Sequence, residues 1–233
     1  MPEIILKVKN LKVSFGKETV IENLSFKVKR GDFISIIGPN GSGKTTLLKA
    51  LLGLIKYEGE IEWKKGIKIN YLPQWFSKES FSVIPITVKE FFELKNTDEE
   101  KIKKAIEMVG LEYKKVLNKN PHELSAGQFQ RLLIAWTFVD EPDVVLLDEP
   151  TTGIDIGGEK TIYHLLYKFW KEKGMTILMV THELNIVYYY STNVLCLHKR
   201  CLAFGKPEDV LNEKILTKTY GIKIKFHKHK MRR

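Results

Sequence analysis

Residues 38–45 carry the pattern G-x-x-x-x-G-K-T, which is typical of a loop that binds nucleotide phosphates. Its glycines let successive backbone N–H groups turn toward phosphate oxygens, and a following helix adds the positive end of its dipole. Lys44 would reach the β and γ phosphates, and Thr45 would offer its hydroxyl to Mg²⁺. A chance match in a glycine-rich turn is the alternative. The strand-like run before the motif and the helical leucine spacing after it favour phosphate binding.

Two carboxylates, Asp148 and Glu149, follow the apolar run 144–147. A buried strand ending here would place Asp148 to orient Mg²⁺, and Glu149 to position or deprotonate the attacking water. Taken alone, a strand that runs into an acidic turn is the simpler interpretation. Together with the phosphate loop, these carboxylates predict a nucleotide hydrolase.

A third motif precedes the helix expected over residues 129–138. It consists of Leu124, Ser125, Ala126, Gly127 and Gln128. Ser125 and Gln128 have the spacing of a capping box, so an ordinary helix start is one interpretation. A helix start with a hydroxyl and a glycine is also an anion site. Two phosphate sites in one chain predict that two chains share their nucleotides.

The elements that must position these residues alternate between apolar runs and turns. Strands are expected at 11–15, 24–28, 33–37, 144–147 and 176–180, and helices at 45–54 and 162–174. Residues 75–140 differ, because they are mostly helical in pattern, with a capping box at Thr87 and Glu90. This order predicts an α/β fold with a parallel sheet that a helical segment interrupts.

The composition narrows the function classes. With 233 residues, 43% hydrophobic and 28% charged, the chain is expected to be a globular protein and not a disordered or collagen-like one. Six of its ten net positive charges lie in residues 222–233, which weakens the case for a nucleic-acid groove. Cys196 and Cys201 form no disulfide framework and no zinc spacing, so we expect packing roles in a reducing compartment. Without a long apolar run or a secretory signal pattern, a cytoplasmic protein is expected.

The motifs together resemble, in order and spacing, the ATP-binding subunits of ABC transporters. Three further motifs carry this resemblance: Tyr71-Leu72-Pro73-Gln74, Gly153-Ile154-Asp155 and Val180-Thr181-His182-Glu183. The resemblance covers nearly the whole chain and implies one ABC ATPase domain. It would have a P-loop NTPase core lobe (1–74 and 141–221) with a mostly parallel sheet, an N-terminal antiparallel β subdomain, an inserted α-helical subdomain (75–140) and a basic tail (222–233).

The resemblance also implies ATP and Mg²⁺ as cofactors. Gln74 would contact Mg²⁺ and the attacking water, His182 the γ phosphate, and Asp155 the other chain of the dimer. Phe15 would stack on adenine, with a place in the core as the alternative. The implied ATP-binding residues are Phe15, Gly38, Pro39, Asn40, Gly41, Ser42, Gly43, Lys44, Thr45 and Thr46. The implied catalytic residues are Glu149, His182 and Gln74, and the implied Mg²⁺ ligands are Thr45, Gln74 and Asp148.

Two residues depart from the family pattern. Ala126 stands where the family usually has glycine, and Trp136 stands where it commonly has arginine. We expect the extra methyl group of Ala126 to weaken the contact with the partner chain only slightly. The pattern alone offers no physical reason for Trp136.

Spacing distinguishes among the members of the family. About eighty residues separate Lys44 from Ser125, which leaves no room for the long coiled coil of chromosome and repair ATPases. Translation factors of the family carry two ATPase halves in one chain, whereas this chain has one. We therefore expect no nucleic-acid partner. The rival enzyme class is a stand-alone nucleotide kinase or GTPase, whose activity would not depend on a dimer. The chain has no N-K-x-D guanine motif, which such a GTPase would carry.

A transport ATPase without a membrane span must dock on integral membrane permease subunits. We therefore expect a homodimer in the ATP-bound state, peripheral on the inner face of the membrane. The apolar residues of 75–92 would line the groove for a permease helix, or form the core of the helical subdomain. Segments 85–88, 193–198 and 205–210 resemble ATPases of zinc and manganese importers, which would add a solute-binding protein. Another solute or an exporter remains the alternative.

Overall fold

The computed structural model describes residues 3–74, 76–152, 154 and 156–222 of the chain. The chain divides into two compact units, one of residues 1–67 and 173–233 and the other of residues 68–172. Asp155 and most of the basic tail lie outside the described residues. Within the described part, no helix combines the length and the apolar character needed to cross a bilayer.

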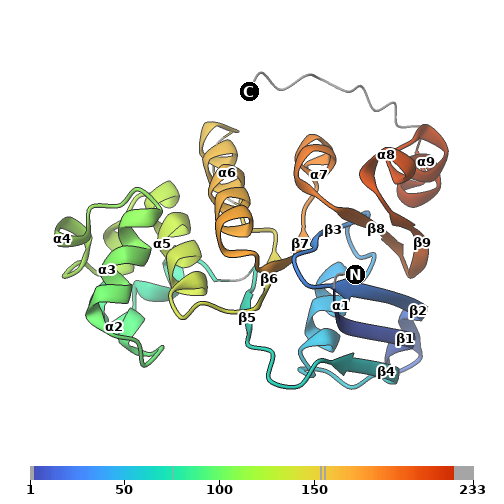
Figure 1. Ribbon diagram of the computed structural model, residues 1–233, viewed down its shortest axis with the longest axis horizontal. Coiled ribbons are helices and arrows are strands. Elements are labelled where there is room, and N and C mark those ends of the chain that lie inside the picture. The colour runs from blue at the N-terminus through green and yellow to red at the C-terminus, as the bar shows by residue number, and fades with distance from the viewer. Residues whose placement is uncertain (1–2, 75, 153, 155, 223–233) are drawn as a thin grey trace. The chain divides into compact units, whose positions relative to one another are not determined.

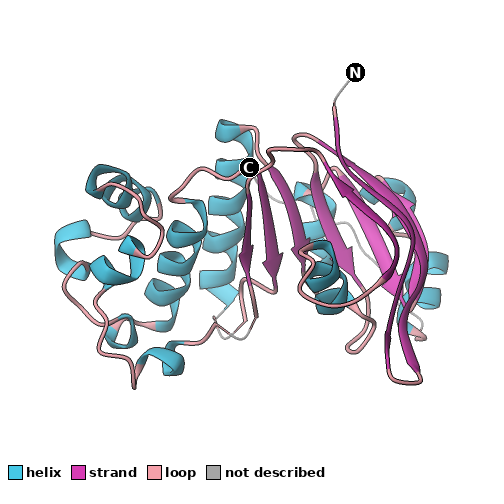
Figure 2. Ribbon diagram, turned by 90° about the horizontal axis from the view of Figure 1, so that it is seen from below, coloured by secondary structure: helices cyan, strands magenta, loops and turns pink. Residues whose placement is uncertain are grey.

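The first unit contains an antiparallel sheet with the strand order β2-β1-β4. Its strands are β1 (Ile4–Phe15), β2 (Glu18–Lys29) and β4 (Glu58–Trp63). The strand that begins at the N-terminus curves along its length (Figure 2), in keeping with the several register shifts between β1 and β2. Alternate residues of β2, among them Leu24 and Val28, are fully buried, which is the pattern of a sheet with one face on the core.

A second sheet of this unit has β3 (Phe33–Ile37) at its centre, between the parallel strands β7 (Thr176–Val180) and β8 (Asn193–His198). Strand β9 (Arg200–Gly205) pairs antiparallel with β8. Every residue of β3 and β7 is buried, as parallel strands covered on both faces require. The helices are α1 (Lys44–Leu51), α7 (Leu184–Tyr190), α8 (Pro207–Val210) and α9 (Glu213–Tyr220).

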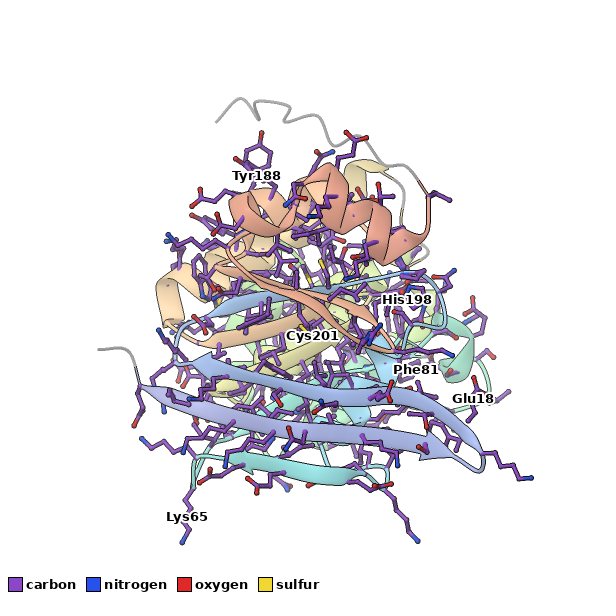
Figure 3. All side chains as sticks on the ribbon, turned by 90° about the vertical axis from the view of Figure 1, so that its right-hand side faces the viewer. Glu18, Lys65, Phe81, Tyr188, His198 and Cys201 are labelled. Atoms are coloured by element: carbon purple, nitrogen blue, oxygen red, sulfur yellow. The ribbon has the colours of Figure 1, made fainter. Side chains whose placement is uncertain are left out.

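Helices α8 and α9 lie beside strands β8 and β9 (Figures 1 and 3). Their buried side chains Val210 and Leu216 join Val194 and Cys196 of β8 in one apolar cluster. Burial raises the pKa of the Cys196 thiol to about 12, so this cysteine stays protonated and inert at neutral pH. The cluster ties the end of the described chain to the strand that runs beside β3.

The second unit is mostly helical around the parallel pair β5 (Ile69–Leu72) and β6 (Val144–Asp148) (Figure 1). Its helices are α2 (Val88–Glu93), α3 (Glu99–Met108), α4 (Tyr113–Val116), α5 (Ala126–Phe138) and α6 (Ile156–Lys173), with 3-10 turns at Lys78–Phe81 and Pro121–Glu123. The expected capping box at Thr87 and Glu90 is present, and the Asp98 side chain caps α3 by accepting from the N–H of Lys101.

The expected α/β fold is confirmed, with differences at the element ends. The first two strands are longer than expected because each continues beyond its most apolar residues, and the helix expected over 45–54 ends at Leu51. The helix expected over 129–138 begins at Ala126, immediately after its capping serine. Helix α7, strand β9 and the two short C-terminal helices were not predicted.

An aromatic cluster in the second unit consists of Phe76, Phe81, Phe91, Phe129 and Trp136. The Trp136 ring stacks on Phe91 with 5.0 Å between centroids, and its Nε1–H donates to the Phe91 carbonyl at 3.1 Å. The Lys95 ammonium lies 4.2 Å from the centroid of the Trp136 ring. Stacking, a hydrogen bond and a cation–π contact with Lys95 thus give a physical reason for the tryptophan at position 136.

Replacing Trp136 tests how much this cluster stabilises the second unit. Trp136→Ala removes the stacking and leaves a cavity, so the free energy of unfolding should fall by about 3 kcal/mol. Trp136→Phe keeps an aromatic ring but loses the hydrogen bond to the Phe91 carbonyl, which should lower the free energy of unfolding by about 1 kcal/mol. Urea denaturation followed by circular dichroism would measure both.

Trp170 of α6 is the matched control, because a lysine also covers its ring, at 4.4 Å, outside the aromatic cluster. Trp170→Ala should cost no more than about 1 kcal/mol, because its ring packs on none of the five rings of the aromatic cluster. Equal losses at Trp136 and Trp170 would contradict a special role for the cluster.

Candidate nucleotide-binding and hydrolysis site

The phosphate loop joins the end of β3 to the start of α1, as expected. Gly38 must be glycine, because a Cβ atom there would lie 2.1 Å from the carbonyl oxygen of Leu197. Gly43 has a left-handed backbone with φ of 97°, and a Cβ there would lie 3.1 Å from the Val20 side chain. The glycines are thus required by close approaches as well as by the turn.

Two polar side chains of the loop, those of Lys44 and Ser42, differ in their hydrogen bonding. The Lys44 ammonium is buried and donates to the carbonyls of Gly38 and Pro39, at 2.9 and 3.0 Å, so it lies across the loop. The Ser42 hydroxyl is also buried, and the described residues supply no hydrogen-bond partner for it. A buried hydroxyl without a partner costs roughly 1–3 kcal/mol. An anion seated in the loop would satisfy it, so the loop fits a phosphate group.

The two carboxylates end strand β6 in the second unit. Asp148 is only 1% exposed, and the Tyr71 hydroxyl donates to its Oδ2 atom at 3.4 Å. Burial, and then the charge of Asp148, raise the pKa of Tyr71, so this hydroxyl remains a donor at all physiological pH values. Tyr71 therefore holds one carboxylate oxygen at the site.

Glu149 has a left-handed backbone with φ of 51°, which is uncommon for a residue with a side chain. The Gln74 side-chain amide donates to its Oε2 atom at 2.7 Å, and the Thr152 hydroxyl donates to its backbone carbonyl at 3.1 Å. The structure thus brings together two of the predicted site residues, Gln74 and Glu149, and it fixes the orientation of the carboxylate.

A pocket of about 260 Å³ lies beside these carboxylates, within the second unit. Its polar lining includes Gln74, Gln130, Asp148 and Glu149, and its apolar lining includes Leu72, Phe129 and Leu133. Both carboxylates therefore face a space large enough for water molecules.

The predicted Mg²⁺ ligands have suitable chemistry. Mg²⁺ prefers oxygen atoms from carboxylates, hydroxyls and amides, which Asp148, Thr45 and Gln74 supply. Asp148 is buried, and one of its oxygens accepts a hydrogen bond from Tyr71, as the carboxylate ligands of metal sites commonly do from a neighbouring residue. The donor set therefore fits Mg²⁺.

The motif at 124–128 starts helix α5. Ser125 accepts from the Gln128 N–H at 3.2 Å, and the Gln128 side chain accepts from the Ser125 N–H at 3.0 Å, so the expected capping box is confirmed. A Cβ atom added at Gly127 would meet nothing within 4 Å. Packing inside this chain therefore does not require a glycine here, and the role in anion binding stays a prediction.

The other residues singled out in the sequence differ in their exposure. Phe15 is 55% exposed, so its alternative place in the core is wrong and its ring is available to a ligand. His182 is exposed and follows β7. The phenylalanines Phe81, Phe91 and Phe92 are buried, which confirms the core interpretation for them, whereas Ile84 is 46% exposed.

Sequence reasoning assigned no role to Tyr71 and Thr152, which contact Asp148 and Glu149. Tyr71 lies on strand β5 one residue before Leu72, on the opposite face from that buried leucine. That alternation, with Asp148 at the end of the paired strand, was the signal that could have identified it.

Comparison with known proteins identifies similar sequences along most of the chain. The family model described as ABC transporter matches residues 21–152. A zinc import ATP-binding protein ZnuC of Wigglesworthia glossinidia brevipalpis is 35% identical over 222 residues, which are 94% of this chain and 94% of that protein. A ZnuC protein of Ehrlichia canis is 37% identical over 219 residues, which are 92% of this chain and 89% of that protein.

Solved structures are similar over comparable lengths. The cbiO1 protein of Clostridium perfringens, part of an ABC transporter complex, has a TM-score of 0.78 at 29% identity, covering 93% of this chain and 94% of that one. A dimeric ATP-binding cassette bound to ADP and phosphate after hydrolysis has a TM-score of 0.72 at 28% identity, covering 87% and 99%. With the family model matched over residues 21–152, these similarities show that the chain belongs to the ABC transporter family, as one of its ATPases.

Proposed function

We propose that this chain is the ATPase subunit of an importer of zinc or manganese ions. The similarity to zinc import ATP-binding proteins, at 35% and 37% identity along about nine-tenths of the chain, supports this substrate class. The ATPase does not touch the transported ion, so its residues do not identify the solute. Import of another solute, or export, is the alternative.

ATP would bind through the phosphate loop, residues 38–46, with Phe15 stacked on the adenine ring. Backbone N–H groups and Lys44 would hold the phosphates, and the buried Ser42 hydroxyl would gain a partner. Thr45, Gln74 and Asp148 would hold Mg²⁺. When bound, Mg²⁺ would neutralise part of the phosphate charge.

Glu149 would act as the base for hydrolysis, and the observation that carries this role is its hydrogen bond with Gln74 at 2.7 Å. As the water oxygen bonds to the γ phosphorus, the Glu149 carboxylate would accept the water proton. The bond from the γ phosphorus to its bridging oxygen would break, and ADP would leave. His182 would contact the γ phosphate. The Gln74 amide holds the carboxylate oriented before the reaction.

Two copies would close around two ATP molecules, each held between the phosphate loop of one chain and residues 124–128 of the other. The open space at Gly127 supports this arrangement, because a Cβ atom there would meet nothing within 4 Å among the described residues of its own chain. Asp155, which lies outside the described residues, would reach the partner chain. The dimeric cassette structure is similar to this chain and agrees with such an assembly.

The dimer would work on the inner face of the membrane, bound to permease subunits, with a solute-binding protein delivering the ion. Val83 and Ile84, which are 85% and 46% exposed, are apolar residues free to contact a permease helix. No nucleic acid is expected as a partner.

The substrate class is tested by uptake in the source cells after deletion of the gene. Accumulation of radioactive zinc or manganese should fall and should return with the wild-type chain, but not with Glu149→Gln. Normal uptake of both metals, with reduced uptake or export of another solute, would contradict metal import and leave the ATPase role intact.

Glu149→Gln tests the assigned base. The glutamine side chain has the same shape as that of glutamate, so ATP should bind as in the wild type. Its amide cannot accept a proton from the attacking water. Hydrolysis should fall by at least about 100-fold. Phosphate release measures turnover, and sedimentation with MgATP should show a trapped dimer where the wild type returns to monomers. Full turnover in this variant would refute the assignment.

Lys44→Ala tests the phosphate loop. Loss of the ammonium should weaken ATP binding by about 100-fold, since a charge-assisted contact is worth up to roughly 3 kcal/mol. Titration with a fluorescent ATP analogue measures the change. Lys49→Ala, in the last turn of the same helix α1, is the matched control and should bind normally. Equal binding by the two variants would exclude Lys44 from the site.

A further inference from the structure

The turn that follows strand β6 is held by side chains from two helices. From helix α5, the side-chain amide of Gln130 donates a hydrogen bond to the backbone carbonyl of Pro150. From helix α6, the hydroxyl of the buried Tyr163 lies 3.1 Å from the Thr151 hydroxyl, within hydrogen-bond distance. Both contacts fall on the two residues that directly follow Glu149.

The contact from Gln130 reaches the one backbone group that Pro150 can offer. A proline has no backbone N–H, so its carbonyl is its only backbone hydrogen-bonding group. Pro150 is buried, and buried backbone carbonyls are nearly always paired. The residue before it, Glu149, has the left-handed φ of 51°, a conformation that persists where the surroundings hold it. Gln130 thus fixes the peptide unit that follows the strained residue.

Two glutamine side chains therefore act on Glu149 from different elements. Gln74 donates to the carboxylate itself, at 2.7 Å, and Gln130 holds the backbone from which that carboxylate extends. Both glutamines line the pocket that Asp148 and Glu149 face. The orientation of the carboxylate in this pocket depends on both ends of the residue being held.

We propose that Gln130 is a positioning residue for hydrolysis, which holds the backbone of Glu149 so that its carboxylate stays directed into the pocket. The proposal rests on the proposed role of Glu149 as the base. Helix α5 also begins with the motif at 124–128, so the same bond ties the base to the part of the chain that is proposed to meet the ATP of the other copy. Gln130 acts through Glu149, and it is therefore expected to affect turnover and not ATP affinity.

Gln130→Met tests this role, because methionine has a similar length and no hydrogen-bond donor. The turnover rate at saturating ATP should fall roughly three- to tenfold, the usual effect of losing one hydrogen bond. The dissociation constant for ATP should stay near the wild-type value. Amide exchange should become faster at Thr152 and Ile154, whose N–H groups donate to carbonyls within this turn. Gln130→Leu, which also lacks the donor, should show the same changes.

Thr137→Val is the matched control, in the same helix. The buried Thr137 hydroxyl donates to the Leu133 carbonyl at 2.7 Å, a bond of the same kind, from a side chain to a backbone carbonyl. Valine keeps the shape of threonine and removes the donor. This variant should lose a similar amount of stability in urea, with turnover and amide exchange at Thr152 and Ile154 as in the wild type. An equal fall in turnover in Gln130→Met and Thr137→Val would indicate general loosening of helix α5 and would overturn the positioning role.

A double variant tests whether Gln130 acts through Glu149. In a chain that already carries Glu149→Gln, no base remains to be oriented, so adding Gln130→Met should leave the residual hydrolysis unchanged. Release of radioactive phosphate from γ-labelled ATP over long incubations measures these slow rates. If Gln130→Met lowers the residual rate by the same factor as it lowers the wild-type rate, its effect is independent of Glu149 and the inference is wrong.

The outcomes separate this inference from the proposed function. If the wild-type chain binds no ATP, or if Glu149→Gln turns over ATP as the wild type does, the proposed function of the site fails. If the wild type hydrolyses ATP and Glu149→Gln does not, the proposed base stands. Wild-type turnover and amide exchange in Gln130→Met would then overturn the positioning role of Gln130 alone.

Discussion

The close approach of the Leu197 carbonyl to Gly38 is the constraint on which the phosphate loop depends. Binding of phosphate by backbone N–H groups requires a loop that turns sharply and stays in place. Gly38 directly follows the fully buried strand β3. The neighbouring strand β8 carries the Leu197 carbonyl, which leaves no space for a Cβ atom at position 38. The buried parallel strands therefore serve the site directly, because any shift between β3 and β8 would move the loop.

The residues proposed for hydrolysis depend on a different constraint, which is backbone strain. Strand β6 ends at Asp148, and Glu149 then adopts a left-handed backbone that costs roughly 1–2 kcal/mol for a residue with a side chain. Strain of this kind persists where surrounding contacts compensate for it. Here Gln74 and Thr152 bind Glu149, and burial holds Asp148. Both carboxylates line the pocket, Asp148 with one oxygen bonded to Tyr71 and Glu149 with one oxygen bonded to Gln74.

The residue types of the site were predictable because phosphate and carboxylate chemistry leaves a mark in the sequence. Gly38, Lys44 and Glu149 belong to short motifs with fixed spacing, and buried strands such as β3 are visible as apolar runs. The supports around them were not predictable. The bond between the Lys199 N–H and the Ser42 carbonyl joins backbone atoms, which every residue has. Strand β9 and helix α7 mix polar and apolar residues over a few positions, too few to show a period.

The two departures from the family pattern, Trp136 and Ala126, differ in whether contacts inside this chain explain them. Trp136 is explained inside this chain, since stacking on Phe91, the hydrogen bond to its carbonyl and the nearby Lys95 account for an indole ring. Ala126 is exposed, and its neighbour Gly127 has open space where a Cβ atom would be, so packing among the described residues does not require a glycine at position 127. Small residues at these two positions would leave room for a partner at the start of helix α5. Small residues at the start of a capped helix allow an anion to come close to the free N–H groups, and in the proposed dimer that anion is the ATP held by the other copy.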